Sequence, residues 1–331
     1  MRITNRMMTS KYIRSLNTLS TDLNKLNGQV SSGRAFTKAS ENTSAAIRAF
    51  QIRRDLARTT GYESNIQHAR ATLENSESAI YHVEELVQNS QTKILQGMNG
   101  TQSSTERAII ATELRNVQEQ MLQTLNTSSS DIYLFGGSNS DTKPFVKDAT
   151  GKLFYNGVSL DSIVDASTLE GDARFVDIGL NIKFDGSGNV DKGSVFNYSI
   201  PGLKIIGSGT ETVDGITVSN NLYDLIGQIA SEFENPNYDG DKVNTLFGQL
   251  QKNSPKVVTA LTEVGSKTSY LDFISNRLET KTINDQERQL SIEGIDPAET
   301  IIQFKSQEAA YNAALQMGAK IIQPSIFDYI S

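Results

Sequence analysis

The sequence of 331 residues contains no cysteine and no tryptophan, and it contains only two histidines. Without cysteine the chain can form no disulfide and offers no thiol for catalysis or metal binding. His68 and His82 fall on one predicted helix, about 21 Å apart at 1.5 Å per residue, so they cannot share a metal ion. With few large aromatic side chains, each residue buries little surface, which favours long helical bundles over a single globular core.

Basic residues are also in deficit, with 31 Lys and Arg against 38 Asp and Glu and a net charge of −7. Nucleic acids and anionic membrane surfaces both require a basic face, so the charge argues against either partner. No apolar run reaches the roughly 18 residues of a membrane helix, and we predict no membrane span. The N-terminus lacks the apolar core and cleavage site of a secretory signal. Composition alone therefore predicts a cytoplasmic protein.

Motifs for catalysis, metals and phosphate groups are incomplete. The segment Asp185–Asp191 faintly resembles a calcium loop, but it lacks glycine at the sixth position and Phe196 replaces the chelating glutamate. The run Gly207–Gly209 is too short for a phosphate-binding loop, and no Gly-Lys-Ser/Thr follows it. We therefore predict no catalytic residue, no cofactor and no metal site, and hence no enzyme.

Heptad patterns at both chain ends are the strongest positive signal. The N-terminal stripe repeats at spacings of four and three, and its members are Tyr12, Leu16, Leu19, Leu23, Leu26 and Val30. The C-terminal stripe follows a helix start at Asp296-Pro297, and its apolar members are Ile301, Phe304, Tyr311, Leu315 and Ile322. A helix with a single apolar stripe is not stable alone. Two interpretations stay open: the helices pair within one subunit, or both are assembly surfaces that are buried only in a polymer.

Further heptad stripes run from Ile66 to Ile94 and from Val257 to Leu278, and these two should pack on each other. Between them, fifteen of the 24 glycines fall between Gly136 and Gly240. Short apolar or alternating runs there predict a small antiparallel β domain, with candidate strands at 153–158, 174–182, 195–200 and 215–218. Helices are predicted to follow at 222–233 and from Asp241 to about Ser291.

The predicted fold is mainly α with a β insert: a long antiparallel helical bundle or coiled-coil rod formed by both chain ends, carrying a small inserted β-rich domain. We divide the chain into an N-terminal assembly helix (1–43), two parts of the helical rod (44–134 and 221–295), the β-rich insert (135–220) and a C-terminal assembly helix (296–331). We expect residues 1–40 and 297–331 to be mobile in the free subunit. We also expect the insert to face outward and residues 150–218 to tolerate replacement.

Several segments resemble the flagellin superfamily, and within it the hook-associated group of the hook–filament junction. The resemblance is carried by Met1–Thr4 (MRIT), Leu23–Arg34 (LNKLNGQVSSGR), Tyr133–Gly137 (YLFGG), Asp141–Phe145 (DTKPF) and Ala313–Ile330 (AALQMGAKIIQPSIFDYI). It covers both ends and both long helical regions but not residues 150–220. The chain departs from the family at Ser40–Thr43, where an Asp-Asp-Pro turn is usual. It departs again at Leu261–Glu263, where Arg-Ala usually precedes the Val-Gly.

The resemblance implies a structural protein that self-assembles at the junction and connects the hook to the flagellin filament. It implies a homo-oligomeric ring, contacts with hook-associated protein 1 and with flagellin, and an export chaperone on the C-terminal segment. It also implies export through the flagellar type III channel, which removes no signal and overrides the cytoplasmic prediction. Flagellin itself is one alternative, although its usual Thr-x-Phe-Asn-Gly segment is missing. A coiled-coil adhesin or signalling rod is another, although it would need a span or a secretory signal.

Overall fold

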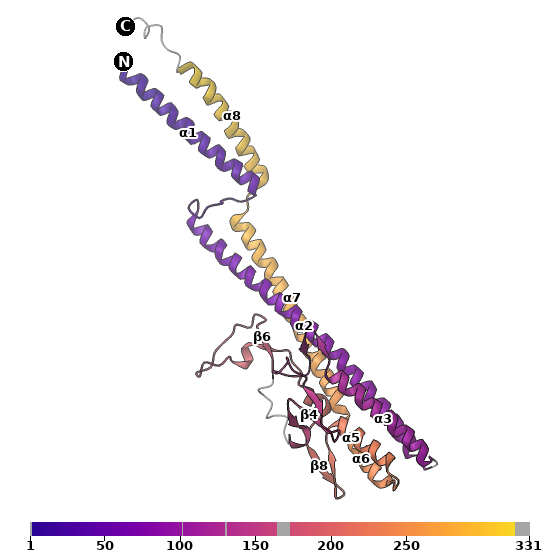
Figure 1. Cartoon of the computed structure of the whole chain (residues 1–331). Coiled ribbons are helices and arrows are strands. Elements are labelled where there is room, and N and C mark those ends of the chain that lie inside the picture. Colours follow the sequence, from indigo (N-terminus) through magenta and orange to yellow (C-terminus); the bar gives the residue numbers. More distant parts are fainter. Residues whose placement is uncertain (1, 101, 130, 164–172, 322–331) are drawn as a thin grey trace. The chain divides into compact units, whose positions relative to one another are not determined.

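The computed structural model describes residues 2–100, 102–129, 131–163 and 173–321 (Figure 1). The chain forms two compact units, which are described separately. The first comprises residues 1–59 and 279–331, and the second comprises residues 60–278. Two long helices, α2 (Thr43–Met98) and α7 (Pro255–Glu293), contribute residues to both units.

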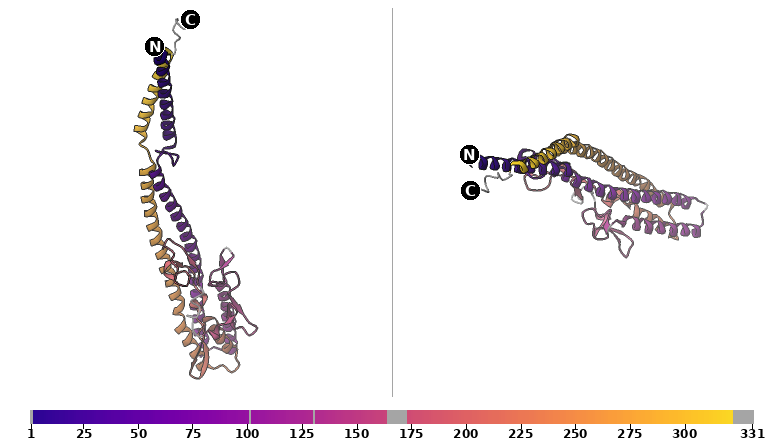
Figure 2. Two further views of the ribbon diagram at one scale, coloured as in Figure 1. Left: turned by 90° about the vertical axis from the view of Figure 1, so that its left-hand side faces the viewer. Right: turned by 90° about the horizontal axis from the view of Figure 1, so that it is seen from above.

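The first unit is helical and contains α1 (Arg2–Ser32), α8 (Pro297–Ile321) and one end each of α2 and α7. Gly33 ends α1 in the left-handed region at φ 68°, which glycine adopts at low cost. Asn42 caps α2 by accepting the Ala45 N–H through its side-chain oxygen. Both further views show α1 and α8 side by side (Figure 2).

The longer helices of the second unit are α3 (Ser104–Leu125), α5 (Leu222–Glu234), α6 (Gly240–Asn253) and the remaining parts of α2 and α7. Ser103 caps α3 in a reciprocal capping box with Glu106. The prediction of one helix from Asp241 to Ser291 was wrong. The helix breaks at Ser254 because Pro255 has no N–H to donate and favours the first turn of a new helix, α7.

The predicted stripes of α2 and α7 do form the interior of the second unit. Ile66, Leu73 and Ile80 of α2 are fully buried, as are Val264 and Leu271 of α7. All five belong to one hydrophobic core. Arg70 of α2 pairs with Asp272 of α7 over 2.9 Å, beside this core.

In the part of the β-rich segment that the structure describes, the strands form four small antiparallel sheets instead of one domain sheet. The first joins β1 (Ser128–Ser129) to β2 (Ile132–Tyr133), and the second joins β3 (Phe145–Lys147), β4 (Leu153–Tyr155) and β5 (Val158–Ser159). The other two pair β6 (Phe175–Val176) with β7 (Phe196–Asn197), and β8 (Thr210–Val213) with β9 (Ile216–Ser219). A five-residue helix, α4 (Gly202–Ile206), lies between the last two pairs.

Turn residues explain where the strand predictions failed. The run predicted as one strand at 153–158 is a hairpin, because Asn156 and Gly157 both have positive φ, at 47° and 83°. The same turn chemistry at Asp214 and Gly215 joins β8 to β9. Two consecutive positive φ values are typical of the tight turn that suits the twist of a two-stranded hairpin.

The insert has buried residues in common with the helices that carry it, and its outward orientation remains a prediction. Tyr155, Leu160 and Ile205 are buried in the same hydrophobic core as the helices of the second unit. The Tyr155 hydroxyl also donates a hydrogen bond to the Phe135 carbonyl over 3.2 Å. The insert and the helices of the second unit therefore share one hydrophobic core. The predicted fold class, mainly α with a β insert, is confirmed.

Candidate assembly interface

The terminal helix pair, α1 with α8, brings together the two stripes that the sequence singled out. Asp296 starts α8 by accepting N–H groups of Ala298 and Glu299 through one carboxylate oxygen, at 2.9 and 3.2 Å. Pro297 occupies the first helical position, where its missing N–H costs nothing. Both ends of the chain thus enter one helix pair.

One close contact fixes how these two helices meet. The Tyr12 hydroxyl donates a hydrogen bond to the Ala314 carbonyl over 2.9 Å. Gly318 lies one helical turn further along α8, where a Cβ atom would lie 2.0 Å from the Tyr12 hydroxyl oxygen. Only glycine leaves room for the tyrosine, so this contact depends on residue types at both chain ends.

The pair covers its stripes only in part. Five members of the N-terminal stripe are half-buried, and Val30 is exposed. In the C-terminal stripe Phe304 and Tyr311 are half-buried, whereas Ile301 is 46% exposed and Leu315 is 44% exposed. Ile322 lies outside the described residues. The intramolecular pairing therefore forms, and it leaves much of both stripes accessible to solvent.

A second set of apolar side chains on the same helices was not predicted from the sequence. These residues lie off the heptad positions and are exposed: Met7, Met8, Ile13, Ile302 and Met317. The neighbouring Ile301-Ile302 pair was a usable signal, because one helical stripe cannot bury two consecutive residues. No apolar side chain between residues 7 and 32 of α1 is fully buried. The terminal pair thus lacks a closed core of its own.

An open groove of about 630 Å³ lies between the C-terminal part of α1 and the N-terminal part of α8. Asp22 and Lys25 of α1 line one side, and Gln303, Ser306 and Gln307 of α8 line the other. Its lining is mostly polar, although Leu26 and Ile302 also contribute to it.

The junction between the helix pairs of the first unit is held by main-chain and ionic contacts. Arg34 and Gly294 form an antiparallel bridge, and the Ala35 N–H donates to the Glu293 carbonyl over 2.7 Å. Arg53 pairs with the buried Glu293 carboxylate over 2.6 Å. Burial would raise the pKa of Glu293, but hydrogen bonds from Arg53 and Gln289 and the Arg53 charge hold it below its usual value. The segment that follows α1 is therefore held against the segment that precedes α8.

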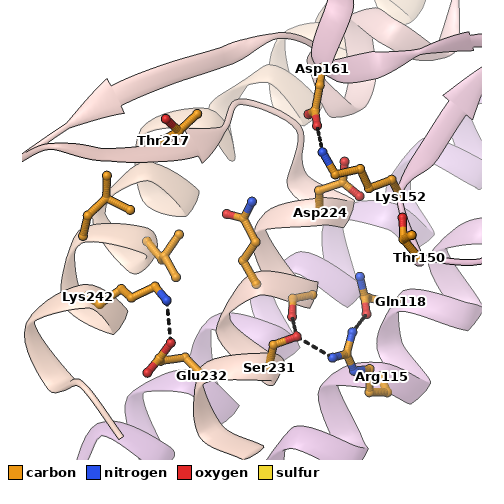
Figure 3. Close-up of a pocket in the computed structure, with 15 residues that line it drawn as sticks. Arg115, Gln118, Thr150, Lys152, Asp161, Thr217, Asp224, Ser231, Glu232 and Lys242 are labelled. Atoms are coloured by element: carbon orange, nitrogen blue, oxygen red, sulfur yellow. Dashed lines mark hydrogen bonds and ion pairs between the residues drawn. The ribbon is translucent and has the colours of Figure 1, made fainter. Parts of the chain in front are cut away.

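A polar pocket of about 430 Å³ lies in the second unit, between α3, α5, α6 and the strands of the insert (Figure 3). Its charged side chains bind one another: Lys152 pairs with Asp161 over 2.6 Å, and Lys242 pairs with Glu232 over 2.7 Å. The Arg115 guanidinium donates a hydrogen bond to the Ser231 hydroxyl over 2.6 Å. These contacts hold α5 against its neighbours, so we assign the pocket a structural role.

Asp224 is the most perturbed carboxyl group of this pocket. It is buried, and burial raises its pKa to about 6 against the opposing hydrogen bond from Asn221, which measures 2.7 Å. The negative charge of Asp161 raises the pKa further. No group of three or more potential metal-ligating side chains occurs within the described ranges.

The region that matches the bacterial flagellin N-terminal helical region covers residues 3–140. It includes α1, α2 and α3, which supply half of the terminal pair and much of the second unit's core. The predicted resemblance to the flagellin superfamily is therefore confirmed over this region.

Within that class, the similarity over the whole chain is to flagellar hook-associated protein 3. The protein of Salmonella typhimurium is 23% identical over 336 residues, covering 99% of both chains. The protein of Escherichia coli is 24% identical over 327 residues, covering 95% of both chains. The 150–220 segment, where the sequence carried no family signal, falls inside these matches.

Solved structures share the fold. A flagellar hook-associated protein of Vibrio parahaemolyticus aligns with a TM-score of 0.60 at 20% identity, over 76% of this chain and 99% of that one. FlgL of Xanthomonas campestris aligns with a TM-score of 0.55 at 14% identity, over 72% of this chain and 99% of that one.

Among the helices that the structure describes, none has an apolar stretch long enough to cross a membrane.

Proposed function

We propose that this chain is a structural component of the bacterial flagellum that assembles at the hook–filament junction and connects the hook to the flagellin filament. The observation that carries the proposal is the end-to-end similarity to two proteins named flagellar hook-associated protein 3. The half-covered terminal pair supports it, because apolar surface exposed along both chain ends is typical of an interaction site.

The assembly interface in this proposal consists of the N-terminal and C-terminal stripes as predicted. Copies of the chain form a ring, with hook-associated protein 1 on the hook side and flagellin on the filament side. The protein leaves the cell through the flagellar type III channel and acts outside it, and an export chaperone holds the C-terminal segment beforehand. The role is structural, and we assign no catalysis to the chain.

Flagellin is the alternative that an experiment must separate from this proposal. Labelled antibody on intact cells should mark a single band at the base of each filament. Labelling along the whole filament would instead identify a filament subunit and overturn the junction assignment.

A further inference from the structure

The amine of Lys256, in the first turn of α7, has neither an ion pair nor a hydrogen bond among the residues that the structure describes. Lys252 lies four positions earlier, at the end of α6, and it pairs with Glu211 over 2.7 Å. The carboxylate nearest to both lysines in charge effect is therefore already engaged by Lys252. Lys256 is left without a direct ionic partner.

A glycine turn brings the Lys256 amine against the main chain. Gly207 ends α4 in the left-handed region at φ 83°. A Cβ atom there would lie 2.8 Å from the Lys256 Nζ atom and 2.6 Å from the Asn220 carbonyl oxygen. Any other residue type would push the lysine away, so glycine at this turn gives the amine its place. The run Gly207–Gly209, which is too short to bind phosphate, has this steric role instead.

The Lys256 side chain is half-buried, yet its nitrogen is not among the fully buried polar atoms of the described residues. Burial disfavours the charged ammonium form, and the positive charge of Lys252 disfavours it further. These two effects lower the pKa of Lys256 against the opposing charge of Glu211. A neutral amine is the nucleophilic form of lysine. Lys256 thus combines the reactive form with access from solvent.

Two other lysines of the second unit have only one of these two properties. Lys252 is exposed, and its ion pair with Glu211 favours the protonated form. Burial lowers the pKa of Lys267, but its side chain is only 15% exposed. The Lys267 amine also donates to the Ser199 carbonyl over 2.9 Å, so the interior holds it. Lys252 is accessible but protonated, and Lys267 is shielded.

We propose that Lys256 is a site of covalent acylation and that its substrate is a small acyl phosphate. The neutral amine attacks the acyl carbon, and a C–N bond forms while the bond from that carbon to the phosphate oxygen breaks. Phosphate leaves with the electron pair, and the amine nitrogen gives up one proton to water. This inference is independent of the proposed junction role and goes beyond it.

The surroundings of Lys256 favour this class of donor. A small donor is required because the lysine lies against the turn at Gly207. The product is an uncharged amide, which costs less to hold in a half-buried position than an ammonium without a counterion. Acylation therefore replaces a poorly compensated charge with a neutral group.

Acetylation of the purified full-length chain tests the proposal, with acetyl phosphate as the probe. Peptide mass spectrometry follows each lysine over time, and fragment spectra distinguish Lys252 from Lys256. At about pH 8 we expect Lys256 to react at least about fivefold faster than Lys252 or Lys267, because it alone of the three is both accessible and readily deprotonated. Lys256→Arg should abolish this signal and leave the rates at the other two lysines unchanged.

Removal of the neighbouring charge tests whether the surroundings cause the reactivity. Lys252→Gln removes a positive charge and frees Glu211 to pair with Lys256. Both changes favour the ammonium form, so acetylation of Lys256 should slow at least about threefold. The matched control is Lys147→Gln, which removes a different exposed ion pair of the second unit, that with Glu119. It should leave the rate at Lys256 unchanged.

Equal acetylation rates at Lys256 and Lys252 would overturn the proposal. A Lys256 rate that does not respond to Lys252→Gln would also overturn it, because the reactivity would then come from simple exposure. Either result would leave the junction role untouched, since that role is tested by the position of the antibody label on intact cells.

Discussion

The Tyr12 hydroxyl donates a hydrogen bond to the Ala314 carbonyl over 2.9 Å, although 302 positions separate the two residues in the sequence. This contact joins the first helix of the chain to the last. The terminal pair therefore depends on both chain ends, and a substitution in either helix affects the packing of the other.

Gly318→Ala tests that contact. The new methyl group would lie 2.0 Å from the Tyr12 hydroxyl oxygen, so α1 and α8 must move apart or the tyrosine must leave its place. We expect faster amide hydrogen exchange in residues 8–26 of the variant. Gly265→Ala is the matched control, because its added methyl group meets nothing within 4 Å. That control should gain up to about 1 kcal/mol from helix propensity. Unchanged exchange in Gly318→Ala would contradict the pairing described.

The helices were the part of the fold that the sequence predicted well, because heptad spacing extends over dozens of residues. The stripes of α2 and α7 lie where they were expected, with Ile66 and Val264 buried. The break at Ser254-Pro255 was missed because the apolar pattern continues on both sides of it. The strands failed more often, because two-residue ladders such as Phe175–Val176 leave almost no periodic signal.

For the candidate interface, the sequence predicted the stripes but could not decide between pairing and exposure. The structure shows both, because α1 and α8 pair through Tyr12 and Ala314 while Leu315 remains accessible. The spacing of apolar residues shows which side of a helix is apolar. A single sequence does not show how much of that side a neighbouring helix covers. The division of the chain at residues 43 and 296, and the assembly role of both stripes, remain predictions.

The ion pair between Arg53 and Glu293 predicts a loss of stability in acid. Because the folded-state pKa of Glu293 is lowered, its contribution is present above about pH 4.5 and is lost as the pH falls through the folded-state value. Glu293→Gln should lower the free energy of unfolding at pH 7 by about 1–3 kcal/mol, as judged by urea titration. The difference in unfolding free energy between this variant and the parent should shrink below pH 4.5. The exposed pair Glu308–Lys305 provides the control, and Glu308→Gln should cost under about 1 kcal/mol.

Asp224 predicts the opposite pH dependence. Its folded-state pKa of about 6 lies above the ordinary value of 3.8, so its contribution to stability is fully present below about pH 3.8 and is lost as the pH rises through 6. Asp224→Asn should raise the free energy of unfolding at pH 7.5 by up to about 3 kcal/mol, and should raise it little at pH 4. A variant that is less stable than the parent at pH 7.5 would show that the carboxylate is needed there.

Replacing parts of the insert tests its place in the core. Exchange of Asp185–Asn189 for a short glycine-serine linker should shift the melting temperature by no more than about 2 °C, because this turn is exposed. Replacement of residues 150–218 by a linker should instead unfold the second unit, since it removes buried residues such as Tyr155 and Ile205. If the variant without residues 150–218 folds cooperatively, the insert is not needed for the core of the second unit.

Leu315 provides the most direct test of the assembly account. It is 44% exposed, so Leu315→Asp should change the stability of the free subunit by no more than about 0.5 kcal/mol. In the assembled state the variant would lose about 2–3 kcal/mol of burial. Desolvating the new carboxylate would cost several further kcal/mol, and every copy in the assembly would carry this cost. Leu315→Met keeps the volume and should cost under about 1.5 kcal/mol.

The deciding measurement pairs subunit melting with motility for Leu315→Asp and Leu315→Met. The account predicts unchanged melting for both, and loss of filaments with flagellin released into the medium for Leu315→Asp alone. A sharp drop in the melting temperature of the Leu315→Asp subunit would contradict it, because Leu315 would then already be buried within one subunit.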